Sequence, residues 1–227
     1  MPAQLVKLQP APDLVEQVHL ALRDAICDGT LAAGTRITQE VLAEQLAVSR
    51  QPVLQALRLL KSDGFVEDAP GRGLRVTTQS GKDIVQLYAV RGALDELAAR
   101  LAARQHHCID ANLLEQGRKA SRGRNVKAMI EADLAFHVAI YAASGNPLIE
   151  RAAAVHWAQL RRVMGAALQS PPQRELVWDE HEAIARAIAA GDEDRAVHLI
   201  GQHLREAGRK LARHLDQSSP LHTGQAS

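Results

Sequence analysis

The chain has 227 residues, which is enough for one large domain or two small ones. Its hydrophobic content of 46% supports a packed core, its net charge of +1 points to no particular partner, and aromatics at 3% argue against RNA recognition by base stacking. No apolar run approaches the roughly 20 residues that a membrane-spanning helix needs, and residues 1–13 show no secretory signal. Because the two cysteines, Cys27 and Cys108, lie far apart along the chain, we expect reduced thiols in a cytoplasmic protein. We expect no membrane partner.

The first part of the chain predicts three helices. Asp13 and Glu16 match a capping box at the start of the first helix, and Gly29 is placed to end it. Thr38 is placed to cap a short second helix, and Ser49 to cap a third. Apolar residues recur at helical spacing within each segment, so the three helices are expected to share a core.

A hairpin follows these helices. Segment 65–76 reads FVEDAPGRGLRV, which predicts two short strands around a Pro/Gly turn. Two helices joined by the short link at 47–49, with a hairpin behind them, describe a winged helix-turn-helix. A β-like segment gives way to a helical one near residues 76–83, so we expect this domain to occupy residues 1–78.

Residues 79–216 predict an antiparallel bundle of six helices. We expect these helices at about 83–105, 110–122, 125–143, 147–169, 174–190 and 192–214. Polar residues 217–227 lack periodicity and are expected to form a disordered tail. The predicted fold class is therefore mostly α, with an N-terminal winged helix-turn-helix and a C-terminal all-α bundle.

One face of the third predicted helix suits a DNA groove, because a recognition helix places its N-terminal residues against base edges and its basic residues near phosphates. Arg50 is placed to contact a guanine. Arg72, at the tip of the hairpin, could enter the minor groove or grip a phosphate. The predicted DNA-binding residues are Thr38, Ser49, Arg50, Gln51, Leu54, Gln55, Arg58, Arg72 and Gly73.

The charge of this half leaves a second interpretation open. Residues 1–78 hold 8 Lys/Arg and 9 Asp/Glu, so the domain is not basic overall. Its positive charge concentrates on the third helix and the hairpin, but a solvated charged face on a generic helical domain would show the same pattern.

Four polar side chains fall on inward-facing stripes of three helices in the second half: Asp133, His137, His181 and His203. Burying a carboxylate and three imidazoles without partners is costly, whereas a divalent cation removes that cost. A divalent metal bound by such residues, for example zinc, nickel or manganese, is therefore one interpretation of the pattern. With 10 histidines in the chain, hydrogen-bonded core residues are the other interpretation. His198 lies elsewhere on its helix and is not a predicted ligand.

A family resemblance covers the first half. Residues 34–76, GTRITQEVLAEQLAVSRQPVLQALRLLKSDGFVEDAPGRGLRV, resemble the DNA-binding half of the GntR family, with the motif LAxxLxVSRxPVxxALRxLxxxGxV followed by a Gly-Arg-Gly wing. The resemblance implies a homodimer that binds a palindromic double-stranded DNA operator. The family usually has Arg-Glu where this chain has Leu54 and Gln55. Because Leu54 can make only an apolar contact, such as with a thymine methyl, the family's half-site is not carried over.

The second half also shows a resemblance. Residues 88–103, 133–147 and 179–204 resemble the FCD ligand-binding domain of the FadR subfamily, in its six-helix VanR-like branch. The family's Asp-x-x-x-His, Glu-His and later histidine fall on Asp133, His137, His181 and His203. The resemblance therefore implies that these four residues bind a metal, with zinc as first choice and nickel or manganese as alternatives, and that a small carboxylic acid effector binds at or beside it. Arg91 matches a family arginine that could clamp this carboxylate. Its alternative role is a surface or interhelix salt bridge with Asp95, one turn further on, where the family usually has glutamate.

Together these patterns predict a transcriptional regulator, usually a repressor in this family, whose binding to DNA changes when the acid binds. One alternative makes the metal itself the signal. The least favoured alternative is a metal-dependent hydrolase: Glu180 and Glu182 flank His181 but face away from it, and no Ser/His/Asp set, phosphate loop or His-Glu-x-x-His motif is present. We therefore expect the protein not to be an enzyme.

Overall fold

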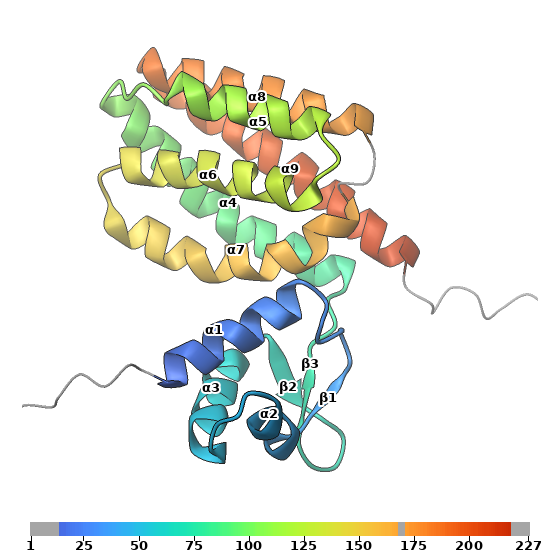
Figure 1. Ribbon diagram of the computed structural model, residues 1–227. Helices are drawn as coiled ribbons and strands as arrows, with labels where there is room; N and C mark the ends of the chain where they lie inside the picture. Colours follow the sequence, from blue (N-terminus) through green and yellow to red (C-terminus); the bar gives the residue numbers. More distant parts are fainter. Residues whose placement is uncertain (1–13, 168–170, 219–227) are drawn as a thin grey trace, which may run out of the picture. The chain divides into compact units, whose positions relative to one another are not determined.

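The computed structural model describes residues 14–167 and 171–218, and it divides the chain into two compact units. The first unit ends at Thr78 and the second begins at Gln79 (Figure 1). The predicted fold class is confirmed, since a small winged unit precedes an all-helical one. The capping residue expected at Asp13 lies outside the described residues.

The first unit contains three helices and a three-stranded antiparallel sheet in its described part. They are α1 (Leu14–Cys27), β1 (Arg36–Ile37), α2 (Gln39–Gln45), α3 (Arg50–Ser62), β2 (Val66–Asp68) and β3 (Leu74–Val76). Strands β2 and β3 form the expected hairpin, and β1 pairs with the other edge of β3, giving the order β1-β3-β2. The two residues of β1 were not predicted, because so short a strand carries no periodic signal.

The expected start of each helix-turn-helix element is present. Thr38 and Ser49 occupy the N-cap positions of α2 and α3 with extended backbones, although neither side chain makes a capping hydrogen bond. In the link between the two helices, Ala47 takes a left-handed conformation with φ of 53°. Helix α3 buries Val53, Ala56, Leu57 and Leu60, so its opposite face is left to the solvent.

The second unit is a bundle whose described helices are α4 (Gly81–Arg104), α5 (Ala111–Arg122), α6 (Val126–Ala143), α7 (Pro147–Ala167), α8 (Pro171–Ala189) and α9 (Glu193–Ser218). Ser80 caps α4 through a capping box with Asp83. Helix α9 continues through 217 and 218, so the expectation of a tail from residue 217 was wrong for these two positions. The rest of the expected tail, 219–227, lies outside the described residues. Among the described helices, none is long and apolar enough to cross a membrane.

Two glycines let large aromatic side chains pack closely against helix backbones in this bundle. A Cβ atom on Gly117 of α5 would lie 1.9 Å from the Trp178 ring of α8. A Cβ atom on Gly208 of α9 would lie 2.9 Å from the ring of Tyr88 on α4. Both distances are shorter than any real carbon contact, so glycine is required for Trp178 and Tyr88 to lie where they do.

Candidate functional site

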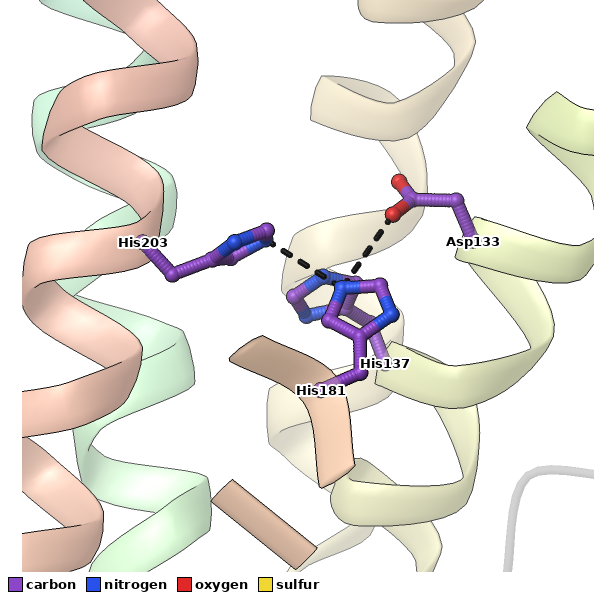
Figure 2. Close-up of side chains that lie close together, drawn as sticks. All are labelled: Asp133, His137, His181 and His203. Carbon is purple, nitrogen blue, oxygen red and sulfur yellow. Dashed lines mark hydrogen bonds and ion pairs between the residues drawn. The ribbon is translucent and has the colours of Figure 1, made fainter. Parts of the chain in front are cut away.

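Four predicted ligands meet inside the second unit. Asp133 and His137 come from α6, His181 from α8 and His203 from α9, and their side chains point toward one another (Figure 2). One donor atom from each residue lies within 4.8 Å of the donor atoms of the others. The Nε2 atom of His181 lies 3.3 Å from Nε2 of His203 and 3.4 Å from Oδ1 of Asp133. The three imidazoles are buried, and the Asp133 side chain is 15% exposed.

This cluster fits a divalent cation. Metal–ligand bonds of about 2.0–2.1 Å place neighbouring ligand atoms about 3.3 Å apart on the edge of a tetrahedron, which matches the two short distances. The Nε2 atom of His137 is buried and has no hydrogen-bond partner. An unsatisfied buried nitrogen costs about 1–3 kcal/mol, and a bound cation would remove that cost. One carboxylate and three imidazoles suit zinc, nickel and manganese alike.

A buried network fixes the orientation of His137. Its Nδ1–H donates to Oδ1 of Asp95 at 2.6 Å, which leaves the Nε2 lone pair directed at the cluster. The Tyr141 hydroxyl donates to the other Asp95 oxygen at 2.9 Å, and Nε1–H of Trp157 donates to the Tyr141 oxygen at 3.2 Å. The sequence suggested Asp95 only as a partner for Arg91, because its contact with His137 depends on how α4 packs against α6.

Different neighbours hold the other two imidazoles. The Nδ1–H of His203 donates to Oε2 of Glu180 at 2.7 Å, so Glu180 supports His203, a role that the sequence did not suggest. The His181 ring stacks on Phe136, with ring centroids 4.1 Å apart, and Trp178 meets it edge-on at 4.7 Å. His181 is therefore positioned by ring packing, whereas its two partners are positioned by hydrogen bonds.

Burial also sets the protonation of the cluster. Burial lowers the pKa of His137 and of His181 well below the ordinary imidazole value, and neighbouring positive groups lower it further. Both rings are consequently neutral near pH 7, which is the form that binds metals. Burial raises the pKa of the Asp133 carboxyl, which is opposite to the effect that a bound cation would have.

Arg91 lies beside the cluster and is 1% exposed. Its Nε lies 3.4 Å from Oδ2 of Asp95, and its guanidinium carbon lies 3.7 Å from the centroid of the Trp157 ring. The expected pair with Asp95 is present, but it is buried rather than on the surface. Nη2 of Arg91 is also buried and has no hydrogen-bond partner, so the guanidinium keeps unsatisfied N–H groups in a residue that lines the neighbouring cavity.

A cavity of about 420 Å³ opens beside these residues. Arg91, Asp133 and His203 are among the residues that line it. Met129, Trp178, Leu204 and other apolar side chains line it too. A volume in this range is typical of pockets that bind small molecules, and a few polar groups among apolar walls are typical of such pockets too.

The first unit presents its predicted DNA-binding residues on the surface. All are exposed except Leu54, which is half-buried. The Arg50 side chain is 69% exposed, and its Nη1 lies 3.3 Å from Oε1 of Glu40. Arg36 of β1 donates from Nη2 to the backbone oxygen of Arg72 and so supports the wing tip, a contact that the sequence gave no reason to expect.

Comparisons with known proteins agree with both units. Residues 14–76 match bacterial regulatory proteins of the gntR family, and residues 86–206 match the FCD domain. The HTH-type transcriptional repressor RspR of Escherichia coli strain K12 is 27% identical over 214 residues, which cover 90% of this chain and 92% of RspR.

Two solved structures resemble most of the chain, across both units. Escherichia coli McbR/YncC has a TM-score of 0.73 at 23% identity, covering 88% of this chain and 97% of that chain. A transcriptional regulator GntR from Rhodococcus sp. RHA1 has a TM-score of 0.71 at 25% identity, covering 87% and 96%. The likeness to McbR/YncC supports the fold alone.

Proposed function

Since the chain belongs to the GntR family of bacterial regulatory proteins and has an FCD domain, it is a transcriptional regulator and not an enzyme, and we propose that a small carboxylic acid controls its DNA binding. The acid would bind in the cavity of the second unit, against a divalent metal and Arg91. The observation that carries this proposal is the unpartnered Nη2 of Arg91, buried beside a cavity that Asp133 and His203 also line. The acid must bind the DNA-competent and DNA-released conformations with different affinity.

We assign DNA contact to the exposed face of α3 and to the wing. Helix α3 would enter the major groove with Arg50, Gln51 and Gln55 toward base edges, while Arg58 would reach the backbone. Thr38 and Ser49 are exposed at helix N-termini, where hydroxyls and backbone amides suit phosphates. Arg72 would contact DNA from the wing. Because a bacterial regulator of this kind acts on chromosomal DNA, we place it in the cytoplasm. We expect it to repress transcription, as the relative RspR is named a repressor.

We also propose a homodimer on a palindromic operator, formed through α4 and α7. Val90, Ala93 and Leu97 recur on one exposed face of α4, where Val90 is 54% exposed and Leu97 is 43% exposed. Leu148 and Val155 form a similar exposed stripe on the neighbouring helix α7. Exposed apolar stripes on adjacent helices mark an interaction surface, and a two-fold operator calls for a second copy of the chain.

The double variant Leu97→Glu with Val155→Glu tests this interface. It should sediment as a monomer in analytical ultracentrifugation; an unchanged dimer would place the interface elsewhere.

A metal-sensing regulator is the second candidate. In that case the ion would bind and leave as the signal, which requires ready exchange. The burial of the imidazoles, together with the support from Asp95 and Glu180, favours a resident ion instead. The contact of Asp133 and His203 with the cavity leaves such an ion within reach of a ligand.

Titration of DNA from upstream of the chain's own coding sequence tests the regulator. We expect Arg50→Ala to weaken binding by about five- to 150-fold, because a bidentate arginine–guanine contact is worth about 1–3 kcal/mol. Arg186→Ala removes an equally charged, exposed side chain from α8 and should leave binding unchanged. Absence of binding to this or any other DNA at low salt would contradict the proposed function.

A further inference from the structure

The cavity extends from the cluster toward the C-terminal end of α9, where its lining becomes cationic. His203, Ala207, Lys210, His214 and Gln217 all line it, at alternating spacings of four and three residues. This spacing places them on a single face of the helix. The far end of the cavity is thus built by the same helix that supplies a predicted metal ligand.

The charges at this end are not explained by the metal cluster. Lys210, Arg213 and His214 line it, and Glu206 is the acidic residue beside them. Glu206 accepts a hydrogen bond from Gln202 at 2.9 Å. Within the described part of the chain, neither Lys210 nor Arg213 forms an ion pair with a carboxylate, although Nε–H of Arg213 donates to the backbone oxygen of residue 209. Two cations therefore line the outer cavity without an acidic partner.

We propose that the ligand of this cavity carries two anionic groups. One carboxylate would bind at the cluster and Arg91, and a second carboxylate or a phosphate would bind at Lys210 and Arg213. Trp178, Leu204 and Leu211 also line the cavity and offer apolar contact to a short carbon chain. This inference rests on the proposed function, since it takes the acid to bind at the cluster.

The helix sets the length of the ligand. His203 and Lys210 are seven residues apart, which is about 10 Å along the helix axis. A lysine side chain on a helix leans back toward the N-terminus, so its ammonium group comes closer to the cluster than its Cα atom does. The two anionic groups of the ligand should then be roughly 5–10 Å apart. Unbranched acids of the length of glutarate or adipate span such a distance.

Calorimetric titration of the full-length, metal-loaded protein without DNA tests this inference. The probes are succinate, glutarate, adipate and suberate, each compared with the monocarboxylate of the same chain length, together with 3-phosphoglycerate. We expect at least one doubly anionic probe to bind about tenfold more tightly than its singly charged counterpart. The affinity of the best dicarboxylate is then compared with that of 3-phosphoglycerate. Tighter binding of the dicarboxylate identifies the second group as a carboxylate, and tighter binding of 3-phosphoglycerate identifies it as a phosphate.

Variants locate the second contact. Lys210→Gln with Arg213→Gln should reduce the preference for the doubly anionic probe to less than about twofold and leave the affinity for the monocarboxylate unchanged. Arg209→Gln removes the same kind of charge from an exposed position that does not line the cavity, and it should change neither affinity.

Equal affinities for mono- and dicarboxylates in the unmodified protein would overturn the inference. So would an equal effect of Arg209→Gln, or a lack of binding by every probe. The first two outcomes leave the proposed function standing, because a singly charged acid could still bind at the cluster and change DNA binding. A lack of binding by every probe would contradict the proposed acid effector as well, whereas DNA binding itself is measured separately and needs none of these acids.

Discussion

Two arginines of this protein make the same short contact in opposite surroundings. Arg50 of α3 lies 3.3 Å from Glu40 with both side chains more than half exposed, whereas Arg91 of α4 lies 3.4 Å from Asp95 with both almost fully buried. An exposed pair contributes about 0–1 kcal/mol, so Arg50 can exchange Glu40 for a base at little cost. Removing one partner of a buried pair costs about 3–5 kcal/mol, so Arg91 is held in place before any ligand arrives.

The two units as a whole differ in the same way, because the predicted functional side chains are mostly exposed in the first unit and mostly buried in the second. The predicted DNA-reading side chains stand on an exposed surface with few partners, and they would acquire their order from DNA. The predicted effector site is assembled in advance from four helices, with Asp95 and Glu180 directing two of its imidazoles. The two units should consequently respond very differently to the loss of a single functional group.

The largest effect is expected at the metal cluster. His181→Ala with His203→Ala removes two of four ligands, so the metal content should fall from about one ion per chain to almost none. Elemental analysis of the purified protein measures this. His198→Ala removes an exposed histidine from the same helix as His203 and should leave the metal content unchanged. Full metal occupancy in the double variant would disprove the ligand assignment.

The next effect compares the two arginine pairs directly. Asp95→Asn leaves the Arg91 charge buried without its partner and should lower the free energy of unfolding by about 3–5 kcal/mol, as measured by urea titration of metal-free protein. Glu40→Gln is the matched change in the exposed pair and should alter it by less than about 1 kcal/mol. Similar changes in the free energy of unfolding for the two variants would show that the buried pair is no more important to stability than the exposed one.

A smaller effect is expected for the glycine beneath Trp178. Gly117→Ala forces the Trp178 ring away from His181, which should cost about 1–3 kcal/mol of stability and weaken metal binding. Gly92→Ala, on helix α4, is the control, because a Cβ atom at this position would have no atom within 4 Å apart from its chain neighbours and the backbone of its own helix. That change should stabilise the protein by about 0.5–1 kcal/mol. A neutral Gly117→Ala variant would show that Trp178 is not fixed by this contact.

The smallest effect concerns the departure at position 54. Leu54→Arg should introduce a preference for guanine worth about 1 kcal/mol at one operator position without destabilising the fold, because the side chain is only half-buried on the outer face of α3. Binding to a set of operators changed one base pair at a time measures this preference. If the variant keeps the original base preference, position 54 does not read bases.

Periodicity and capping residues were sufficient to predict the helices and the two-unit arrangement. Val53 and Leu57 recur at core spacing, and Gly191, with φ of 74°, marks the break between α8 and α9. The same logic placed His181 and His203 on inward stripes, because a histidine that interrupts an apolar stripe must face the core. The structure brings these residues together with Asp133 and His137.

The supporting network could not be predicted in this way. The contact of Asp95 with His137 joins positions 42 residues apart, and that of Glu180 with His203 joins positions 23 apart. Each depends on the rotation of one helix against another, which no local pattern specifies. The strand β1 was missed for the opposite reason, since two residues are too few to show any period.

Fluorescence anisotropy of labelled upstream DNA, titrated with a panel of mono- and dicarboxylic acids, tests the control of DNA binding by the helical unit most directly. The unmodified protein and the His181→Ala/His203→Ala variant should bind this DNA with equal affinity when no acid is present. The acid with the strongest effect should change the affinity of the unmodified protein at least about fivefold, the lower end of typical allosteric coupling, and should leave the variant unaffected. An equal response of both proteins to that acid would show that the effector does not act through the metal cluster.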